Sequence, residues 1–442
     1  MLRWIFGGRE AQSSAEKSGV LRIGEEQPKN CFTELQVLKG HFDIVRFLVQ
    51  IDDFRCASAG DDGLVLVWNV ETGERVQELR GHSQQITAMA VFRCGDVRLV
   101  TASSDRSVSL WDPDTGNRVQ TVLDLQSSVK CILVLERLSA WISAGEQLCV
   151  WSKDFRLECL KEPHSDTGIS SLIELPKNRV AAAVDKSIVI YKIMPCGDTL
   201  AIVEVSCLAD HQDHIRALVN VNDGMFASGS HAGELILWDA LDCSVLAYQH
   251  ISREEPQTGT QSHVGGPKPS EMSIQHLASN GNLVAAAAGS GVYVFSAATG
   301  AAVAYRKRAH DSDVLHTALL SDSELMSCSE DGSVRMWDIQ ELPLAGEPAS
   351  PGFFGMWTLG RSSKQTCPAS KKTPDLPAIR TLELTGDLIG HSGAVQMFLA
   401  FPENGLVTCS ADHQLILWKN GEKQSQLRSL ALFRKLEENG GL

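Results

Sequence analysis

The chain has 442 residues, a formal net charge of −14 and a hydrophobic share of 43%, which is ordinary for a folded protein. No stretch is basic enough to follow a phosphate backbone, so we do not expect a nucleic-acid partner. The twelve cysteines contain no CxxC spacing, which argues against a zinc site or thioredoxin-like chemistry. The apolar stretch at residues 1–8 is too short for a signal peptide or a membrane span. These features predict a cytoplasmic protein without direct membrane insertion.

Taken in chain order, residues 1–32 resemble a linker and predict a flexible N-terminal tail, in which Leu2, Trp4, Ile5 and Phe6 form a small apolar group. Residues 33–38 then alternate between polar and apolar side chains, as a β-strand does. This strand precedes the first Gly-His pair of a repeating pattern.

The repeat begins with a histidine and ends, about 27 residues later, in a tryptophan. An Asp- or Gly-bearing turn and alternating apolar residues precede each tryptophan, which is typical of a short strand entered through a tight turn. Five such units run from His41 to Trp68, His82 to Trp111, His211 to Trp238, His310 to Trp337 and His391 to Trp418. Three degenerate units end at Trp151, at Tyr191 (led by His164, with Asp185 retained) and at Phe295.

The period of these eight end-points is about 40 to 47 residues outside two insertions, and it resembles that of the WD40 repeat, with four strands in each blade. We therefore predict an all-β fold, a single eight-bladed WD40 β-propeller over residues 33–424. The last repeat supplies only three strands, so we expect the N-terminal strand to complete it and close the ring. Residues 425–442 are expected to form a short C-terminal helix and tail.

The complete repeats contain polar side chains that can satisfy one another inside the fold. Burying such groups without partners would cost a few kcal/mol each. Their His, Ser and Asp members also match a catalytic triad in composition, but an active site is built once and a scaffold element many times. The predicted structural tetrads are His82, Ser103, Asp105 and Trp111; His310, Ser329, Asp331 and Trp337; and His391, Ser410, Asp412 and Trp418.

The sequence contains none of the motifs GxxxxGK[ST], HExxH, GxSxG and GxGxxG. We therefore predict that the protein is not an enzyme and has no catalytic residue, cofactor or metal site. It is expected to bind other proteins.

Two insertions interrupt the repeat. Residues 251–272 are polar and rich in Gly and Pro, and we interpret them as a solvated, mobile loop between blades five and six. Residues 341–379 separate Trp337 from a strand at 380–384, which we expect to be the outer strand of blade seven. Their centre is Pro351, Gly352, Phe353, Phe354, Gly355, Met356 and Trp357.

Burying each large apolar side chain of this centre is worth about 1.5 to 3 kcal/mol. The loop could fold back onto its own blade, or its centre could insert into a partner's cleft. We favour insertion, since loops longer than about 15 residues are usually functional or disordered.

The C-terminal segment predicts a helix from Ser425 to Gly440. Such a short helix is marginal without tertiary contacts, so it either packs against blade eight or docks to a partner, and both alternatives stay open. Its broad apolar side contains Leu430, Leu432, Phe433 and Leu436, although Glu437 interrupts it.

Outside the repeats, the sequence resembles one family of WD40 proteins nearly end to end. The resemblance rests on non-repeat stretches at residues 1–4, 23–27, 41–50, 211–213, 229–236, 386–392 and 434–440. It implies a non-catalytic subunit of a complex with two DENN-domain proteins. One is the product of the gene whose repeat expansion underlies amyotrophic lateral sclerosis and frontotemporal dementia, and the other is the Smith–Magenis chromosome region protein.

The same resemblance implies a link to small-GTPase regulation and autophagy. It also implies recruitment to the lysosomal membrane surface through a PQ-loop transporter of cationic amino acids. The family's transporter-binding loop matches residues 351–357. Its DENN-contacting end matches blade eight, the first strand and the C-terminal helix, with Leu427, Leu430, Phe433 and Leu436 as candidate docking residues.

A second possibility is a substrate receptor of a cullin-type ubiquitin ligase. Such receptors resemble one another in a W-D-x-R pattern, and the Trp-Asp pairs at Trp111, Trp238 and Trp337 all lack the arginine. This departure weakens the ligase interpretation.

Overall fold

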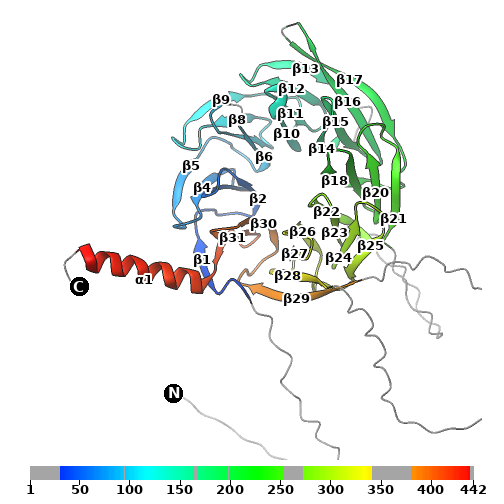
Figure 1. Cartoon of the computed structure of the whole chain (residues 1–442). Coiled ribbons are helices and arrows are strands. Elements are labelled where there is room, and N and C mark those ends of the chain that lie inside the picture. Colours follow the sequence, from blue (N-terminus) through cyan, green and yellow to red (C-terminus); the bar gives the residue numbers. More distant parts are fainter. Residues whose placement is uncertain are drawn as a thin grey trace, which may run out of the picture.

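The computed structural model describes residues 30–93, 95–162, 168–197, 199–251, 272–340 and 380–438. In these ranges the strands form six separate four-stranded sheets and one eight-stranded sheet, arranged as a ring around a central opening (Figure 1). The eight-stranded sheet consists of two four-stranded antiparallel units joined at their outer strands. The predicted all-β propeller is confirmed.

The first four blades follow one another along the chain. Blade 1 contains β2 (Val45–Gln50), β3 (Arg55–Gly60), β4 (Val65–Asn69) and β5 (Arg75–Leu79). Blade 2 contains β6 (Ile86–Phe92), β7 (Arg98–Ser103), β8 (Val108–Trp111) and β9 (Arg118–Val122). Blade 3 contains β10 (Cys131–Leu135), the 3₁₀ helix η1 (Glu136–Leu138), β11 (Ala140–Ala144), β12 (Leu148–Ser152) and β13 (Leu157–Lys161). Blade 4 contains β14 (Ile169–Leu175), β15 (Arg179–Val184), β16 (Ser187–Cys196) and β17 (Thr199–Leu208).

The remaining blades complete the ring. Blade 5 contains β18 (Ile215–Asn222), β19 (Met225–Ser230), β20 (Glu234–Asp239) and β21 (Val245–His250). Blade 6 contains β22 (Ile274–Ser279), β23 (Leu283–Ala288), β24 (Gly291–Ser296) and β25 (Ala302–Arg306). Blade 7 contains β26 (Val314–Leu319), β27 (Glu324–Ser329), β28 (Ser333–Gln340) and β29 (Arg380–Ile389). Blade 8 contains β30 (Val395–Phe401), β31 (Gly405–Ser410), β32 (Leu415–Lys419) and, from the other end of the chain, β1 (Glu34–Leu38).

The eight predicted repeat end-points all lie on the third strand of a blade, from Trp68 on β4 to Trp418 on β32. Third strands are buried between their neighbours, which explains the apolar residues that precede each end-point. Seven of the inner strands also contain a β-bulge near their start, which shifts the register at Val45/Phe47 in blade 1 and at Ile215/Ala217 in blade 5.

Blade 8 is closed by strand pairing between the two ends of the chain. β1 runs antiparallel to β32, with Glu34 opposite Lys419 and Leu38 opposite Leu415. The closure predicted from residues 33–38 is therefore confirmed, and it removes the open edge of β32.

The core consists of eight apolar clusters, and each fills the space between two neighbouring blades. The cluster between blades 8 and 1 joins Leu38 of β1 to Trp68 and Leu417. Because no blade buries its faces alone, the ring is stabilised as one unit.

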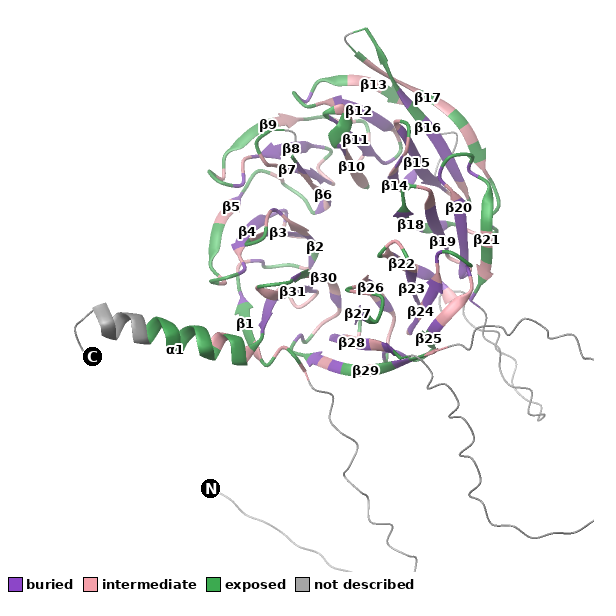
Figure 2. Cartoon of the chain, in the orientation of Figure 1, coloured by how far each residue is buried: buried purple, intermediate pink, exposed green. Residues whose placement is uncertain are grey.

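The helix α1 spans Gly421–Glu438 and begins four residues earlier than the predicted Ser425. Asn420 explains the difference, because its Oδ1 accepts the backbone N–H of Lys423 at 3.0 Å and so caps the first turn. The helix leaves the ring at blade 8 and its described residues are mostly exposed (Figure 2).

Candidate functional site

Each complete repeat contains a chain of four polar side chains that lies inside its blade. In blade 2, the Trp111 indole N–H donates to Thr101 Oγ1 at 2.8 Å. Thr101 Oγ1 lies 2.8 Å from His82 Nε2, and His82 Nδ1 lies 3.2 Å from Asp105. The polar chain joins strands β7 and β8, the turn between them and the loop that precedes the blade, so it fixes how the blade folds.

The predicted hydroxyl member of these chains was wrong. Side chains two residues apart on a strand share a face, so spacing alone allowed either hydroxyl. Ser103 lies at the strand end, where its Oγ donates to the Gln84 carbonyl and accepts the Asp105 N–H, so it holds the turn. The same correction applies in blades 7 and 8: the hydroxyl members are Thr101, Ser327 and Thr408, not Ser103, Ser329 and Ser410.

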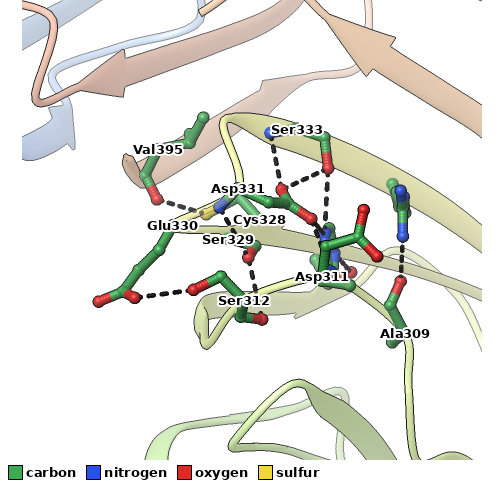
Figure 3. A network of polar contacts seen from close by, with 12 residues as sticks. Ala309, Asp311, Ser312, Cys328, Ser329, Glu330, Asp331, Ser333 and Val395 are labelled. Carbon is green, nitrogen blue, oxygen red and sulfur yellow. Dashed lines mark hydrogen bonds and ion pairs between the residues drawn. The ribbon is translucent and has the colours of Figure 1, made fainter. Parts of the chain in front are cut away.

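Blade 7 shows how the aspartate is held (Figure 3). Asp331 lies 3.0 Å from His310 Nδ1 and accepts bonds from the N–H and the hydroxyl of Ser333 and from the N–H of Asp311. Burial opposes ionisation, but these donors lower the pKa of Asp331 to about 2. The carboxylate is therefore charged at neutral pH.

In the histidines of these polar chains, burial is the effect that decides the direction of the pKa shift. Burial lowers the pKa of His310, and the neighbouring Asp331 offsets only part of this effect. His82, His211 and His391 show the same direction for the same first reason. A neutral imidazole between a hydroxyl and a carboxylate can donate to one and accept from the other, which suits a structural bridge.

Two further polar chains, in blades 1 and 5, were not predicted from the sequence. In blade 1, Ser58 Oγ accepts the Trp68 indole N–H and lies 2.8 Å from His41, which in turn contacts Asp62. The sequence does contain a signal for the hydroxyl member, because this residue stands ten positions before the tryptophan in blades 1, 2, 5, 7 and 8.

The chain of blade 5 ends in a glutamate. Glu234 lies 3.2 Å from His211 Nδ1 and also accepts the Gln212 N–H and the hydroxyls of Ser230 and Tyr248. It lies on strand β20, and the usual aspartate position two residues earlier is Ala232. The longer side chain spans the extra distance.

The degenerate blades 3 and 4 use other contacts. In blade 3 the Trp151 indole donates to Ser143, and its ring stacks on Trp141 with centroids 5.1 Å apart. In blade 4, Asp185 lies 2.6 Å from His214 of the next blade. The predicted leading residue of blade 4, His164, lies outside the described residues.

The candidate partner-docking helix is attached to the ring at its base. Lys423 pairs with Glu403 of blade 8 at 2.7 Å, and Arg428 pairs with Glu34 of β1 at 3.0 Å. Farther along, Leu427 and Leu430 are 49% and 56% exposed. These two leucines therefore do not pack against blade 8, which removes that alternative for them.

The side chains of the other two candidate docking residues, Phe433 and Leu436, are outside the described part of the structure. The candidate transporter-binding residues Pro351 to Trp357 are outside it as well. Within the described ranges no helix is both long and apolar enough to cross a membrane.

Four-stranded blades, each closed by a tryptophan–hydroxyl–histidine–carboxylate chain where the repeat is complete, define a WD40 β-propeller, a class whose members are generally non-catalytic scaffolds. The chain belongs to the WDR41 β-propeller family, whose model matches residues 1–428. It is 52% identical over 455 residues to WD repeat-containing protein 41 of Homo sapiens, and the match covers 100% of this chain and 99% of the relative. The same protein of Mus musculus is 49% identical with the same coverage.

Solved structures are similar in fold alone. The computationally designed Ika8 protein matches with a TM-score of 0.61 at 21% identity, over 86% of this chain and 98% of its own. The U3-55K structure matches with a TM-score of 0.51 at 18% identity, over 68% and 92% of the two chains.

Proposed function

We propose that this chain is a scaffold subunit that joins two DENN-domain proteins, in a complex that regulates small GTPases and autophagy, to the lysosomal surface. The DENN proteins bind blade 8 and α1. The loop at residues 341–379 binds a PQ-loop transporter of cationic amino acids. The proposal is supported by the resemblance described above and by one observation in particular, the exposed leucines of α1.

The helix supports the proposal because its described leucines are exposed and belong to no apolar cluster of the ring. An isolated helix of this length is marginal in water. The two ion pairs at its base are exposed, and because water screens such pairs they add little to the stability of the helix. Burying Leu427 and Leu430 in a partner would stabilise the helix and the complex together.

The neighbouring strand extends this surface. β1 is the outer strand of blade 8, and its Leu35 and Val37 are exposed beside the Glu34 that anchors Arg428. Side chains alternate along a strand, so Leu35 and Val37 lie on the opposite face of β1 from Glu34, and a partner that covers both α1 and this face meets apolar side chains from both ends of the chain. We assign the DENN contact to this combined surface, Leu35, Val37, Leu427 and Leu430.

The transporter-binding loop leaves the ring from a different place. Its two flanking strands, β28 and β29, pair at Gln340 and Thr381, and β29 also pairs with β25 of blade 6. The loop ends are thereby fixed at the rim of blades 6 and 7, whereas α1 leaves from blade 8. Separate attachment points would let the scaffold bind both partners at once.

A pull-down from detergent-solubilised lysosomal membranes, with both DENN proteins added, tests the proposal. A Phe353→Ala, Phe354→Ala, Met356→Ala variant is expected to lose the transporter and keep the DENN proteins. A Leu427→Glu, Leu430→Glu variant is expected to lose the DENN proteins and keep the transporter. Leu246→Glu is the matched control, because Leu246 is 50% exposed on β21 of blade 5.

The control should retain both partners. If the loop variant retains the transporter, the lysosomal contact lies elsewhere on the propeller. If the helix variant retains the DENN proteins, the exposed leucines of α1 are not the docking surface.

A further inference from the structure

A polar cleft lies between blades 4 and 5, beside the central opening. Its volume is about 270 Å³, and its lining includes Ser170 and Asp185 from blade 4 and His214, Arg216 and His231 from blade 5. The inner strands β14 and β18, which carry Ser170 and Arg216, lie side by side in Figure 1 and pack against each other. The cleft is smaller than the pockets that take drug-sized ligands, and it suits a single charged group.

A comparison between blades 1 and 5 shows why this cleft differs from the rest of the ring. Arg46 and Arg216 occupy the same position, the bulge residue that follows the buried Val45 or Ile215. In blade 1, Arg46 makes two bonds to Asp61, at 2.6 and 2.7 Å, so its charge is neutralised within the blade.

Blade 5 has a histidine where blade 1 has that aspartate. Asp61 directly follows Gly60, the partner of Val45, and His231 directly follows Ser230, the partner of Ile215. His231 Nδ1 lies 2.9 Å from Ser273 Oγ of the connection to blade 6. Arg216 is exposed and forms no ion pair with any residue in the described ranges.

One described carboxylate, that of Asp185, also lines the cleft. Asp185 lies 2.6 Å from His214 Nδ1, and its backbone carbonyl accepts the Ile215 N–H. Among the described lining residues Asp185 is the one acidic side chain, and its nearest charged or titratable neighbour in the structure is His214, with no ion pair to Arg216. The guanidinium of Arg216 has no hydrogen-bond or ion-pair partner in the described part of the structure, so its N–H donors are available to a ligand.

We propose that this cleft binds an anionic side chain, a carboxylate or a phosphate, presented by a peptide segment of a partner protein. A guanidinium offers a planar fork of N–H donors that matches both groups, and arginines recognise acidic and phosphorylated motifs in this way. The site lies on blades 4 and 5, whereas α1 leaves from blade 8 and the strands that flank residues 341–379 belong to blade 7, so the site adds a third docking point and does not depend on the proposed function.

Fluorescence anisotropy with the full chain tests the proposal. The probes are three fluorescein-labelled peptide pools with randomised flanks and a fixed central phosphoserine, glutamate or serine. We expect at least one anionic pool to bind about tenfold or more tightly than the serine pool. Preference for phosphoserine alone identifies phosphate as the ligand group, and equal binding of the glutamate pool identifies a general acidic group.

Three variants make the test specific to the cleft. Arg216→Ala is expected to reduce binding of the anionic pool to the level of the serine pool. His231→Asp is expected to do the same while retaining the arginine, because it recreates the self-neutralised pair of blade 1. Arg46→Ala removes an arginine from the same position of another blade and is expected to leave binding unchanged.

Thermal unfolding of each variant checks that the ring is intact. The proposal is overturned if no anionic pool binds better than the serine pool, if Arg216→Ala binds as the wild type does, or if Arg46→Ala weakens binding equally.

Discussion

Glu234 Oε2 lies 3.2 Å from His211 Nδ1, so a glutamate completes the polar chain of blade 5, whereas aspartates complete those of blades 1, 2, 7 and 8. The glutamate stands four residues before Trp238, at the position that Ser107 and Ser333 occupy in blades 2 and 7. Those serines also contact the histidine of their blade. The single side chain of Glu234 thus takes the place of both the aspartate and the serine that contact the histidine in blades 2 and 7.

Glu234→Ala should destabilise the propeller by about 2 to 4 kcal/mol, because it leaves buried donors on His211, Ser230 and Gln212 without their acceptor. Urea unfolding followed by tryptophan fluorescence measures the loss. A double variant, Ala232→Asp with Glu234→Ser, rebuilds the arrangement of blades 2 and 7 and is expected to recover at least half of it. If the double variant is no more stable than Glu234→Ala, the two arrangements are not equivalent.

Thr101→Val should cost about 2 to 3 kcal/mol, since it removes the hydroxyl that serves both the Trp111 indole and His82. Ser103→Ala should cost about 1 kcal/mol, because only turn contacts are lost. Thr101→Ser keeps the hydroxyl and is the matched control. Equal losses for Thr101→Val and Ser103→Ala would contradict the assignment of the hydroxyl member.

Acidification should destabilise the ring through a close pair of buried histidines. His276 of β22 and His316 of β26 have ring centroids 4.1 Å apart, and burial lowers the pKa of His276 to about 4. The unfolded chain therefore binds a proton at this position as the pH falls below about 6.5, while the folded chain does not until about pH 4. Stability is thus expected to be complete above about pH 6.5 and to decrease as the pH falls towards 4.

The variant His276→Asn tests this source of pH dependence, because an amide oxygen can still accept the Thr317 N–H that His276 Nδ1 accepts at 3.3 Å. Melting temperatures measured between pH 7.5 and pH 4.5 should fall less steeply for the variant than for the wild type. Parallel curves would show that other groups account for the acid sensitivity.

Truncations at the two ends of the chain should differ strongly in their effect on the stability of the ring. Ending the chain after Asn420 removes α1 and is expected to shift the melting temperature by no more than a few degrees, because the described leucines of α1 lie outside every apolar cluster. Starting the chain at Lys39 removes β1 and Leu38, which is expected to open blade 8 and cause aggregation. Circular dichroism melts and size-exclusion chromatography distinguish these outcomes.

The repeats were predictable from sequence because each third strand combines a turn, an alternating apolar run and an aromatic residue. The same reasoning placed the closing strand, since a blade with three strands needs a fourth. It failed between Thr101 and Ser103, because both side chains share a strand face and only the fold shows which one meets the indole. It also missed the start of α1, where Asn420 acts as the cap.

Contacts between blades were not predictable from the repeat. Asp185 looked like the carboxylate of its own blade, yet it pairs with His214 of the next one. The lack of an ion pair at Arg216 likewise depends on the residue at another position, His231 in the turn after β19. Such features depend on how neighbouring units differ, and a repeat pattern describes only what the units share.

The pairing of β1 with β32 also affects the order of events during synthesis. The ribosome makes β1 before every other strand of the ring, and it makes the partner strand last. Each intermediate blade can pair locally as it emerges, but the nascent ring stays open until residues 415–419 are available. A chain that stalls before that point would carry two unpaired sheet edges, and it would be a substrate for chaperones or for degradation.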